Sequence, residues 1–290
     1  MRMKSFIVFS VTALLLGLMY SCQNSADRRG NAAADTSFQV SADTFADLQI
    51  LRYQVPGFET LSLQQKKLAY YLSEAALCGR DIIYDQRGKY NLLIRKTIEN
   101  IYATYKGDRT TPDWEKFKTY AGRFWFSNGN HHHYGNEKFI PECSFGYFSK
   151  LVKGSDTGKL PLADGETVDD FLVRLQPIVF DPSFQPKMVD LSPDKDNVAA
   201  SSNNFYEGVT QKEVEAYYAR FDTKGNAPSW GLNSKVVKED GKVTEKVWKS
   251  GGMYGSAIDK IIYWLEKAVT VAENEQQRDA LEKLIAYYKS

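Results

Sequence analysis

The sequence lacks every short motif that marks a common catalytic centre. Among its 290 residues there is no HExxH zinc helix, no G-x-S-x-G nucleophile elbow, no Walker loop and no G-x-G-x-x-G fingerprint. Its acidic residues are scattered without paired context. The absence of these motifs argues against a self-contained zinc protease of the HExxH type, a serine hydrolase of the elbow type and a P-loop or dinucleotide-binding enzyme.

Excess charge and cysteine are also scarce. The 37 Lys and Arg balance 36 Asp and Glu, so the net charge of +1 creates no field that would recruit nucleic acid. Of three cysteines, Cys78 and Cys143 form the one possible pair if Cys22 is modified. A disulfide scaffold would need more cysteines in a shorter chain, so we expect buried free thiols. With 43% hydrophobic residues, the chain can bury a sizeable core.

The N-terminus has the pattern of an export signal. Arg2 and Lys4 precede an apolar run over residues 6–20, and Ser21-Cys22 follows. The run is shorter than the roughly 20 apolar residues that span a bilayer. A small residue before Cys22 predicts a bacterial lipoprotein signal (residues 1–22) whose cysteine is acylated. An ordinary secretory signal with an incidental cysteine is the alternative.

Both readings place the protein outside the cytoplasm. If Cys22 is acylated, the lipid is the only contact with the membrane. No acidic run follows Cys22, which favours a periplasm-facing protein in the cell envelope. Residues 23–44 are rich in Ala, Ser, Asn and Asp and have few large apolar side chains, so we expect a flexible tether.

The remainder, residues 45–290, predicts an α+β fold with a mainly helical first half. Apolar periodicity, caps and turn residues predict helices over residues 64–78, 90–105, 112–126, 164–175, 211–221 and 257–288, the last as one or two helices. Two Val-rich runs around Asp240-Gly241 predict a β-hairpin over residues 234–249. Pro182, Pro186 and the polar run after Leu191 interrupt residues 177–193 and favour irregular structure there.

The last helix has an apolar face with no following element to cover it. This face is formed by Leu284, Ile285, Tyr287 and Tyr288. It suggests a chain that is incomplete at its C-terminus. A helix that docks back on its own core is the alternative.

Residues 127–135 form the most conspicuous polar cluster and contain all three histidines. Zinc needs ligands that converge on one point, whereas adjacent residues point in different directions, so we expect no metal here. Gly129 and Gly135 favour a shaped loop with Asn, His and Tyr side chains available to a ligand. An ordinary polar surface loop is the alternative.

Several segments, taken in order, resemble dipeptidyl peptidase III, particularly the bacterial branch of that zinc metallopeptidase family. The resemblance covers residues 45–290 and is strongest in residues 45–53, 64–81, 129–141, 204–210 and 251–267. It implies part of a two-lobed fold around a wide cleft, with a β-barrel in the lower lobe. The hairpin over residues 234–249 would belong to that lobe.

The resemblance also implies a binding site. Residues 129–141 look like the family's loop that borders the peptide cleft, so the substrate-binding candidates are Asn130, His133, Tyr134 and Gly135. His133 and Tyr134 would contact the first residues of a bound peptide, while Asn130 and Gly135 would shape the loop. The histidine run departs from the Tyr, Lys and Ser more typical of the eukaryotic pattern.

The family's chemistry would lie in another part of the protein. An HExxGH helix and a second Glu-bearing helix hold its zinc, and neither occurs in this sequence. We therefore expect no catalytic or metal-binding residue in this chain, which would form one wall of a zinc enzyme that releases dipeptides from peptide N-termini. Its partners would be an oligopeptide substrate and a missing C-terminal catalytic portion. A non-catalytic peptide-binding lipoprotein is the alternative.

Overall fold

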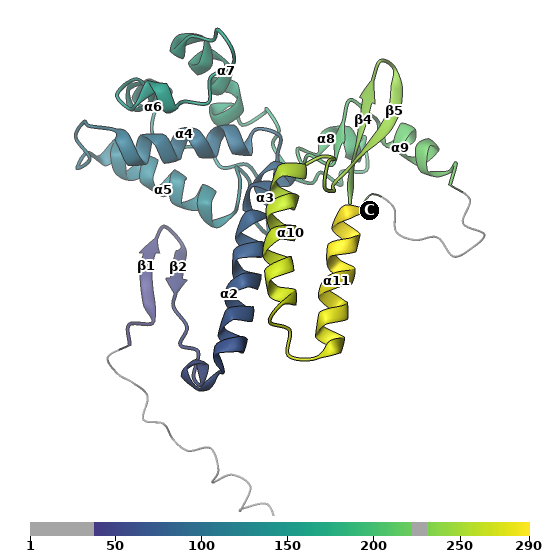
Figure 1. Ribbon diagram of the computed structural model, residues 1–290. Helices are drawn as coiled ribbons and strands as arrows, with labels where there is room; N and C mark the ends of the chain where they lie inside the picture. The colour runs from purple at the N-terminus through teal and green to yellow at the C-terminus, as the bar shows by residue number, and fades with distance from the viewer. Residues whose placement is uncertain (1–37, 222–230, 232) are drawn as a thin grey trace, which may run out of the picture. The chain divides into compact units, whose positions relative to one another are not determined.

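The computed structural model describes residues 38–221, 231 and 233–290, which belong to two compact units, one ending at residue 54 and one beginning at residue 55 (Figure 1). The predicted signal peptide, its Cys22 and most of the predicted tether lie outside these residues. Within them, no helix combines the length and the apolar composition that a bilayer span requires.

The first unit contains a short antiparallel hairpin of β1 (Ser41–Phe45) and β2 (Leu48–Leu51). Phe45 pairs with Leu48, and Ala46 in the turn has a positive φ of 49°. The end of the predicted tether, residues 41–44, therefore lies in a strand.

The first half of the second unit is helical, as predicted. One group of helices is α3 (Arg80–Arg87), α4 (Asn91–Thr104), α5 (Pro112–Phe126), α6 (Phe145–Lys153) and α7 (Val168–Phe180). Their shared core includes the fully buried rings of Phe117, Phe124, Phe148 and Phe171. Helix α5 begins where the sequence predicts, because the Thr111 side chain accepts a hydrogen bond from Trp114 N at 3.2 Å and Pro112 needs no donor at the first position.

Helix α7 runs further than the prediction. It begins after the capping box of Thr167 and Asp170 and continues through Pro177 to Phe180, in a stretch expected to be irregular. Pro177 cannot donate to the carbonyl of Val173. Val173 lies on the exposed face of the helix, with 72% of its surface accessible, so water can replace the missing donor.

A second group consists of α2 (Leu63–Cys78), α10 (Gly255–Val269) and α11 (Glu275–Lys289), which lie side by side in Figure 1. Leu281 and Ile285 of α11 are buried in their common core. Leu284 and Tyr287 on the same helix remain 39% and 52% exposed. The last helix thus docks on its neighbours and leaves part of its apolar face uncovered.

The strands of the second unit form one small sheet in the order β3 (Tyr206–Glu207), β4 (Ser234–Glu239), β5 (Lys242–Val247). The predicted hairpin is confirmed, with φ of 50° at Asp240 and 75° at Gly241. The parallel partner β3 was not predicted from the sequence. Next to the sheet lie α8 (Asn197–Ala200) and α9 (Gln211–Tyr218), and α9 begins at the predicted Thr210–Glu213 capping box.

The fold class is α+β, as expected. The sheets among the described residues have two and three strands, and neither closes into a barrel. Cys78 and Cys143 are both free thiols, and burial raises the pKa of Cys143 to about 11.

The C-terminal end of α3 connects these groups of elements. The Asp85 carboxylate accepts hydrogen bonds from the Tyr254 hydroxyl at 2.6 Å and from the Asn204 amide at 3.0 Å. The backbone N–H of Asn204 donates to the Gln86 carbonyl at 2.9 Å. Helix α3 therefore holds both the start of α10 and the segment before β3 in place.

Candidate functional site

The predicted binding loop follows α5 and is fixed at its start by Asn130. Only 3% of Asn130 is exposed, and its side-chain oxygen accepts a 2.8 Å hydrogen bond from the Tyr120 hydroxyl. Its backbone N–H donates to the Asn91 side chain at 3.1 Å. Burial raises the pKa of Tyr120 above its ordinary value, so the phenol stays a donor. Asn130 faces the protein interior and shapes the loop.

Gly129 permits this arrangement. Its φ is 154°, a conformation that side chains disfavour, and a Cβ there would lie 2.4 Å from Asn91 Nδ2. That nitrogen is already engaged, because it donates to the Tyr84 carbonyl at 3.0 Å. The glycine therefore lets the loop backbone approach a buried asparagine of α4.

His131 is the second anchor and is 4% exposed. Its Nε2 lies 2.8 Å from the Gln185 carbonyl and 3.1 Å from Ser202 Oγ. A carbonyl only accepts, so Nε2 carries the proton, and Nδ1 is left with a lone pair and no hydrogen-bond partner in the described part of the chain. Burial, with the charges of Lys138 and Arg87, lowers the pKa of His131. The imidazole is a neutral structural group.

The returning arm of the loop is fixed by Lys138. Its amine donates to the carbonyls of Asp181 at 2.6 Å and Phe184 at 2.8 Å, just beyond the C-terminal end of α7. Burial lowers the pKa of Lys138 to about 8, and the Asp181 carboxylate opposes this shift. Lys138 also pairs with His131 in an antiparallel bridge. The two arms therefore form a closed turn.

His132 holds the tip of the turn. Its Nδ1 accepts backbone N–H hydrogen bonds from Tyr134 at 3.2 Å and from Gly135 at 3.0 Å. Two donors on one nitrogen require a lone pair, so the ring proton is on Nε2. Asn and Asp side chains in Asx-turns accept hydrogen bonds from backbone N–H groups a few residues later in the same way. His132 thus orders the backbone beneath Tyr134.

His133 and Tyr134 form the outward part of the loop. Tyr134 is 84% exposed, and its ring centroid lies 4.4 Å from that of His133. The His133 ring packs at 5.0 Å edge-on against Phe126, and its Nδ1 lies 3.2 Å from Ser127 Oγ. The Tyr134 ring therefore packs against the imidazole of His133, which Phe126 and Ser127 hold in place. The phenol can stack on a ligand or hydrogen-bond to it.

Gly135 has a steric role. A Cβ there would lie 2.0 Å from Glu137 Oε2, so a larger residue would displace that carboxylate. Of the four predicted residues, His133 and Tyr134 share an accessible surface, while Asn130 and Gly135 support it. The binding role of all four remains a prediction.

Sequence reasoning missed the groups that hold this loop. Asn91, Gln185 and Ser202 lie 39, 54 and 71 residues from the loop residues they bond. No local pattern connects such distant positions. The available signal in the sequence was Gly129 itself, because a glycine in a loop can mark a close backbone approach, but it does not identify the partner.

The histidine run does not fit a metal centre. His131, His132 and His133 each direct a ring nitrogen to a different partner, so their lone pairs do not converge. Nor does the described part of the chain bring together three or more His, Cys, Asp or Glu side chains in a metal-binding group. The arrangement can bind a ligand through rings and hydrogen bonds, and no zinc step is assigned to it.

Comparison of the sequence with protein-family models and with curated proteins finds no match. Solved structures that are similar to the chain include two dipeptidyl peptidases III. DPP III from Caldithrix abyssi is 17% identical with a TM-score of 0.48, and dipeptidyl-peptidase III from Corallococcus sp. strain EGB is 18% identical with a TM-score of 0.48. Each match covers 81% of this chain and 32% of the other chain. The chain therefore spans about a third of the length of these two structures.

Proposed function

We propose that this chain is the N-terminal, cleft-forming part of a zinc-dependent dipeptidyl peptidase that releases dipeptides from the N-termini of oligopeptides. Five segments in the family's order support the proposal, above all residues 45–53 and the loop over residues 129–141. Since the chain contains no HExxGH helix and its histidines do not form a zinc site, its own contribution is binding. Zinc and the residues that use it would come from a further portion of the enzyme.

The observation that carries the proposal is the exposed ring of Tyr134, packed against the half-buried ring of His133 on an anchored turn. Asn130, His131 and Lys138 hold the two arms through buried or partly buried hydrogen bonds, and Tyr134 projects from the tip. A surface that is already ordered loses little entropy when a ligand binds. Such a turn suits an extended peptide, whose carbonyls accept from the phenol and whose side chains stack on the ring.

We also propose that Cys22 is acylated and that the protein faces the periplasm from its lipid anchor. The support is the sequence of residues 1–22, with a basic start, a short apolar run and a small residue before the cysteine. Intact mass of protein extracted from membranes tests this proposal, because acylation and signal removal each change the mass. A protein that retains an unmodified Cys22 would contradict it.

Peptide binding can be tested by calorimetry on the full-length chain in detergent, with a tetrapeptide that has a free N-terminus. We expect saturable binding, and replacement of Tyr134 by Ala should weaken it by about tenfold, the loss of one stacking and hydrogen-bonding group. Tyr53, which is 81% exposed, supplies the matched control, and Tyr53→Ala should bind normally. Equal loss in both variants, or no binding by the wild type, would refute the role of the loop.

The mass and zinc content of the native protein distinguish the two functional hypotheses. A protein much heavier than 32.9 kDa that holds about one zinc supports the peptidase. A metal-free protein near this mass that still binds the tetrapeptide would instead be a non-catalytic peptide-binding lipoprotein.

A further inference from the structure

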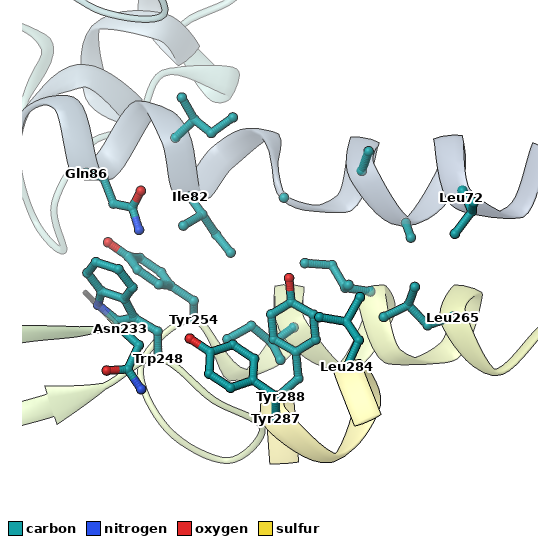
Figure 2. Close-up of a pocket in the computed structure, with 16 residues that line it drawn as sticks. Leu72, Ile82, Gln86, Asn233, Trp248, Tyr254, Leu265, Leu284, Tyr287 and Tyr288 are labelled. Atoms are coloured by element: carbon teal, nitrogen blue, oxygen red, sulfur yellow. The ribbon is translucent and has the colours of Figure 1, made fainter. Parts of the chain in front are cut away.

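A second, chemically different pocket lies between the α2–α3 segment and the α10–α11 pair. Figure 2 shows Leu72, Ile82 and Gln86 on one side and Leu265, Leu284 and the two tyrosines of α11 on the other. The pocket has a volume of about 520 Å³. That volume lies within the range of roughly 300–1,000 Å³ found for small-molecule sites.

The walls of this pocket are uncharged. Its lining residues include no Asp, Glu, Lys, Arg or His. Most of the lining is aliphatic or aromatic, with Trp248 and Tyr254 forming one end next to Gln86. The pocket is partly open, since Leu72 and Leu284 are each 39% exposed, so a charged group placed against its walls would lose part of its hydration without gaining a partner. The lining therefore selects a neutral, largely apolar ligand.

Four polar groups of the lining are available for hydrogen bonding. They are the primary amides of Gln86 and Asn233 and the hydroxyls of Tyr287 and Tyr288. None of the four hydrogen-bonds to another side chain or backbone group that the structure describes. A primary amide donates and accepts at once, so it can pair with both groups of a ligand amide.

Tyr254 differs from these four groups. Its hydroxyl donates to the Asp85 carboxylate at 2.6 Å, and its backbone has a positive φ of 62°. A tyrosine is strained in this conformation and needs surrounding contacts to hold it there. Packing against Trp248, with ring centroids 6.0 Å apart, supplies one such contact. Tyr254 is thus a fixed wall, and the amides beside it are free to meet a ligand.

We propose that this pocket binds an uncharged ligand that joins one large apolar group to a carboxamide, as an apolar residue within a peptide chain does. The apolar group would lie against Leu72, Leu265 and Leu284, and the carboxamide would hydrogen-bond to the Tyr288 hydroxyl, one helical turn from Leu284. The site goes beyond the proposed function, because it excludes the charged N-terminus that a dipeptidyl peptidase must accommodate. It also shares no residue with the loop that contains Tyr134.

N-acetyl-phenylalaninamide is the probe, titrated into the full-length chain by calorimetry beside zwitterionic phenylalanine. We expect saturable binding of the blocked amide and at least about tenfold weaker binding of the zwitterion. Leu72→Glu should weaken binding of the blocked amide by about tenfold or more, since it places a charge in the pocket. Leu77→Glu is the matched control, because Leu77 lies on the same helix, is 61% exposed and does not line the pocket.

Two further variants keep the test decisive. Leu284→Glu changes the opposite wall at a residue that is 39% exposed, and should repeat the effect if Leu72→Glu impairs folding. Tyr288→Phe should weaken binding of the blocked amide by about fivefold, the loss of a neutral hydrogen bond, while toluene should bind as before.

Three outcomes would overturn the assignment: no saturable binding of the blocked amide, equal binding of the zwitterion, or self-association through this face that Leu72→Glu abolishes. Because these variants leave the Tyr134 loop intact, tetrapeptide binding there is measured independently. Failure of one site is therefore distinguishable from failure of the other.

Discussion

The Tyr120 hydroxyl and the side-chain oxygen of Asn130 lie 2.8 Å apart in a buried hydrogen bond that joins α5 to the loop that follows it. Each partner is at most 3% exposed, so water cannot replace either one. The bond fixes the loop from within, and the accessible residues His133 and Tyr134 follow directly. The shape of the candidate site therefore depends on a side chain that no ligand touches.

Replacement of Tyr120 by Phe tests this dependence. The ring still fills the core, but the oxygen of Asn130 loses its donor in a dry environment. We expect the free energy of unfolding to fall by about 1–3 kcal/mol, the cost of an unsatisfied buried acceptor. Denaturant unfolding measures the change. Tyr263→Phe, at a tyrosine that is 52% exposed, is the control and should be near neutral; an equal effect there would contradict the explanation.

The second prediction concerns Gly129, in the same loop, and the stability of the fold. In Gly129→Ala the new Cβ would lie 2.4 Å from Asn91 Nδ2, in a backbone conformation that alanine disfavours. The two effects together should destabilise the fold by about 2 kcal/mol or more.

Gly165→Ala separates the steric effect from backbone strain. Gly165 has a φ of +75°, and a Cβ there would meet no atom within 4 Å. We expect this control to lose only about 1 kcal/mol, the cost of the conformation alone. If thermal or denaturant unfolding shows the same loss for both variants, the close approach to Asn91 is not what requires glycine at position 129.

Local chemistry in the sequence predicts the ends of several elements well. The Thr111-Pro112 pair, the Thr210–Glu213 capping box and the Asp240-Gly241 turn each act over a few residues, and each gives the predicted boundary. The extension of α7 through Pro177 could not be predicted, because it depends on the solvent exposure of Val173. Strand β3 was missed because two residues contain no periodicity and pair with a partner far along the chain.

In the candidate site, too, the sequence predicts local features but not those that depend on tertiary contacts. Sequence reasoning chose His133 and Tyr134 as the residues that contact a bound peptide, and that role stays a prediction. Their rings are adjacent, with Tyr134 exposed and His133 half-buried. Sequence reasoning could not tell that His131 is buried, because three consecutive histidines look alike until distant groups are placed. Gln185 and Ser202 make that distinction, and both contacts are tertiary.

His131 predicts a pH dependence of stability. Its pKa is lowered in the fold from the ordinary value of 6.5, chiefly because burial disfavours the charged ring. Between pH 6.5 and the folded-state pKa, the unfolded chain therefore binds more protons than the folded chain. The free energy of unfolding consequently decreases as the pH falls below 6.5. The loss continues until the folded-state pKa is reached. Above pH 6.5 this group contributes no pH dependence.

The measurement is the free energy of unfolding at several pH values between 7.5 and 5 for the wild type and for His131→Gln. Glutamine can still donate to the Gln185 carbonyl but cannot be protonated in this range. We expect the variant to show a shallower decline. A decline of equal slope in both proteins would assign the pH dependence to other groups.

His132 gives the last prediction, which concerns the order of the loop. Its Nδ1 accepts from the backbone N–H groups of Tyr134 and Gly135, so His132→Phe keeps the ring but removes the acceptor. Both amides then lose their partner within the turn, and we expect their hydrogen exchange to accelerate severalfold while global stability changes little. In His132→Asn, the side-chain oxygen can accept from the same two positions in an Asx-turn and should restore protection. Hydrogen exchange resolved by NMR reads each amide separately and needs no ligand. Unchanged exchange in His132→Phe, or no recovery in His132→Asn, would show that the turn is ordered by its anchored arms alone.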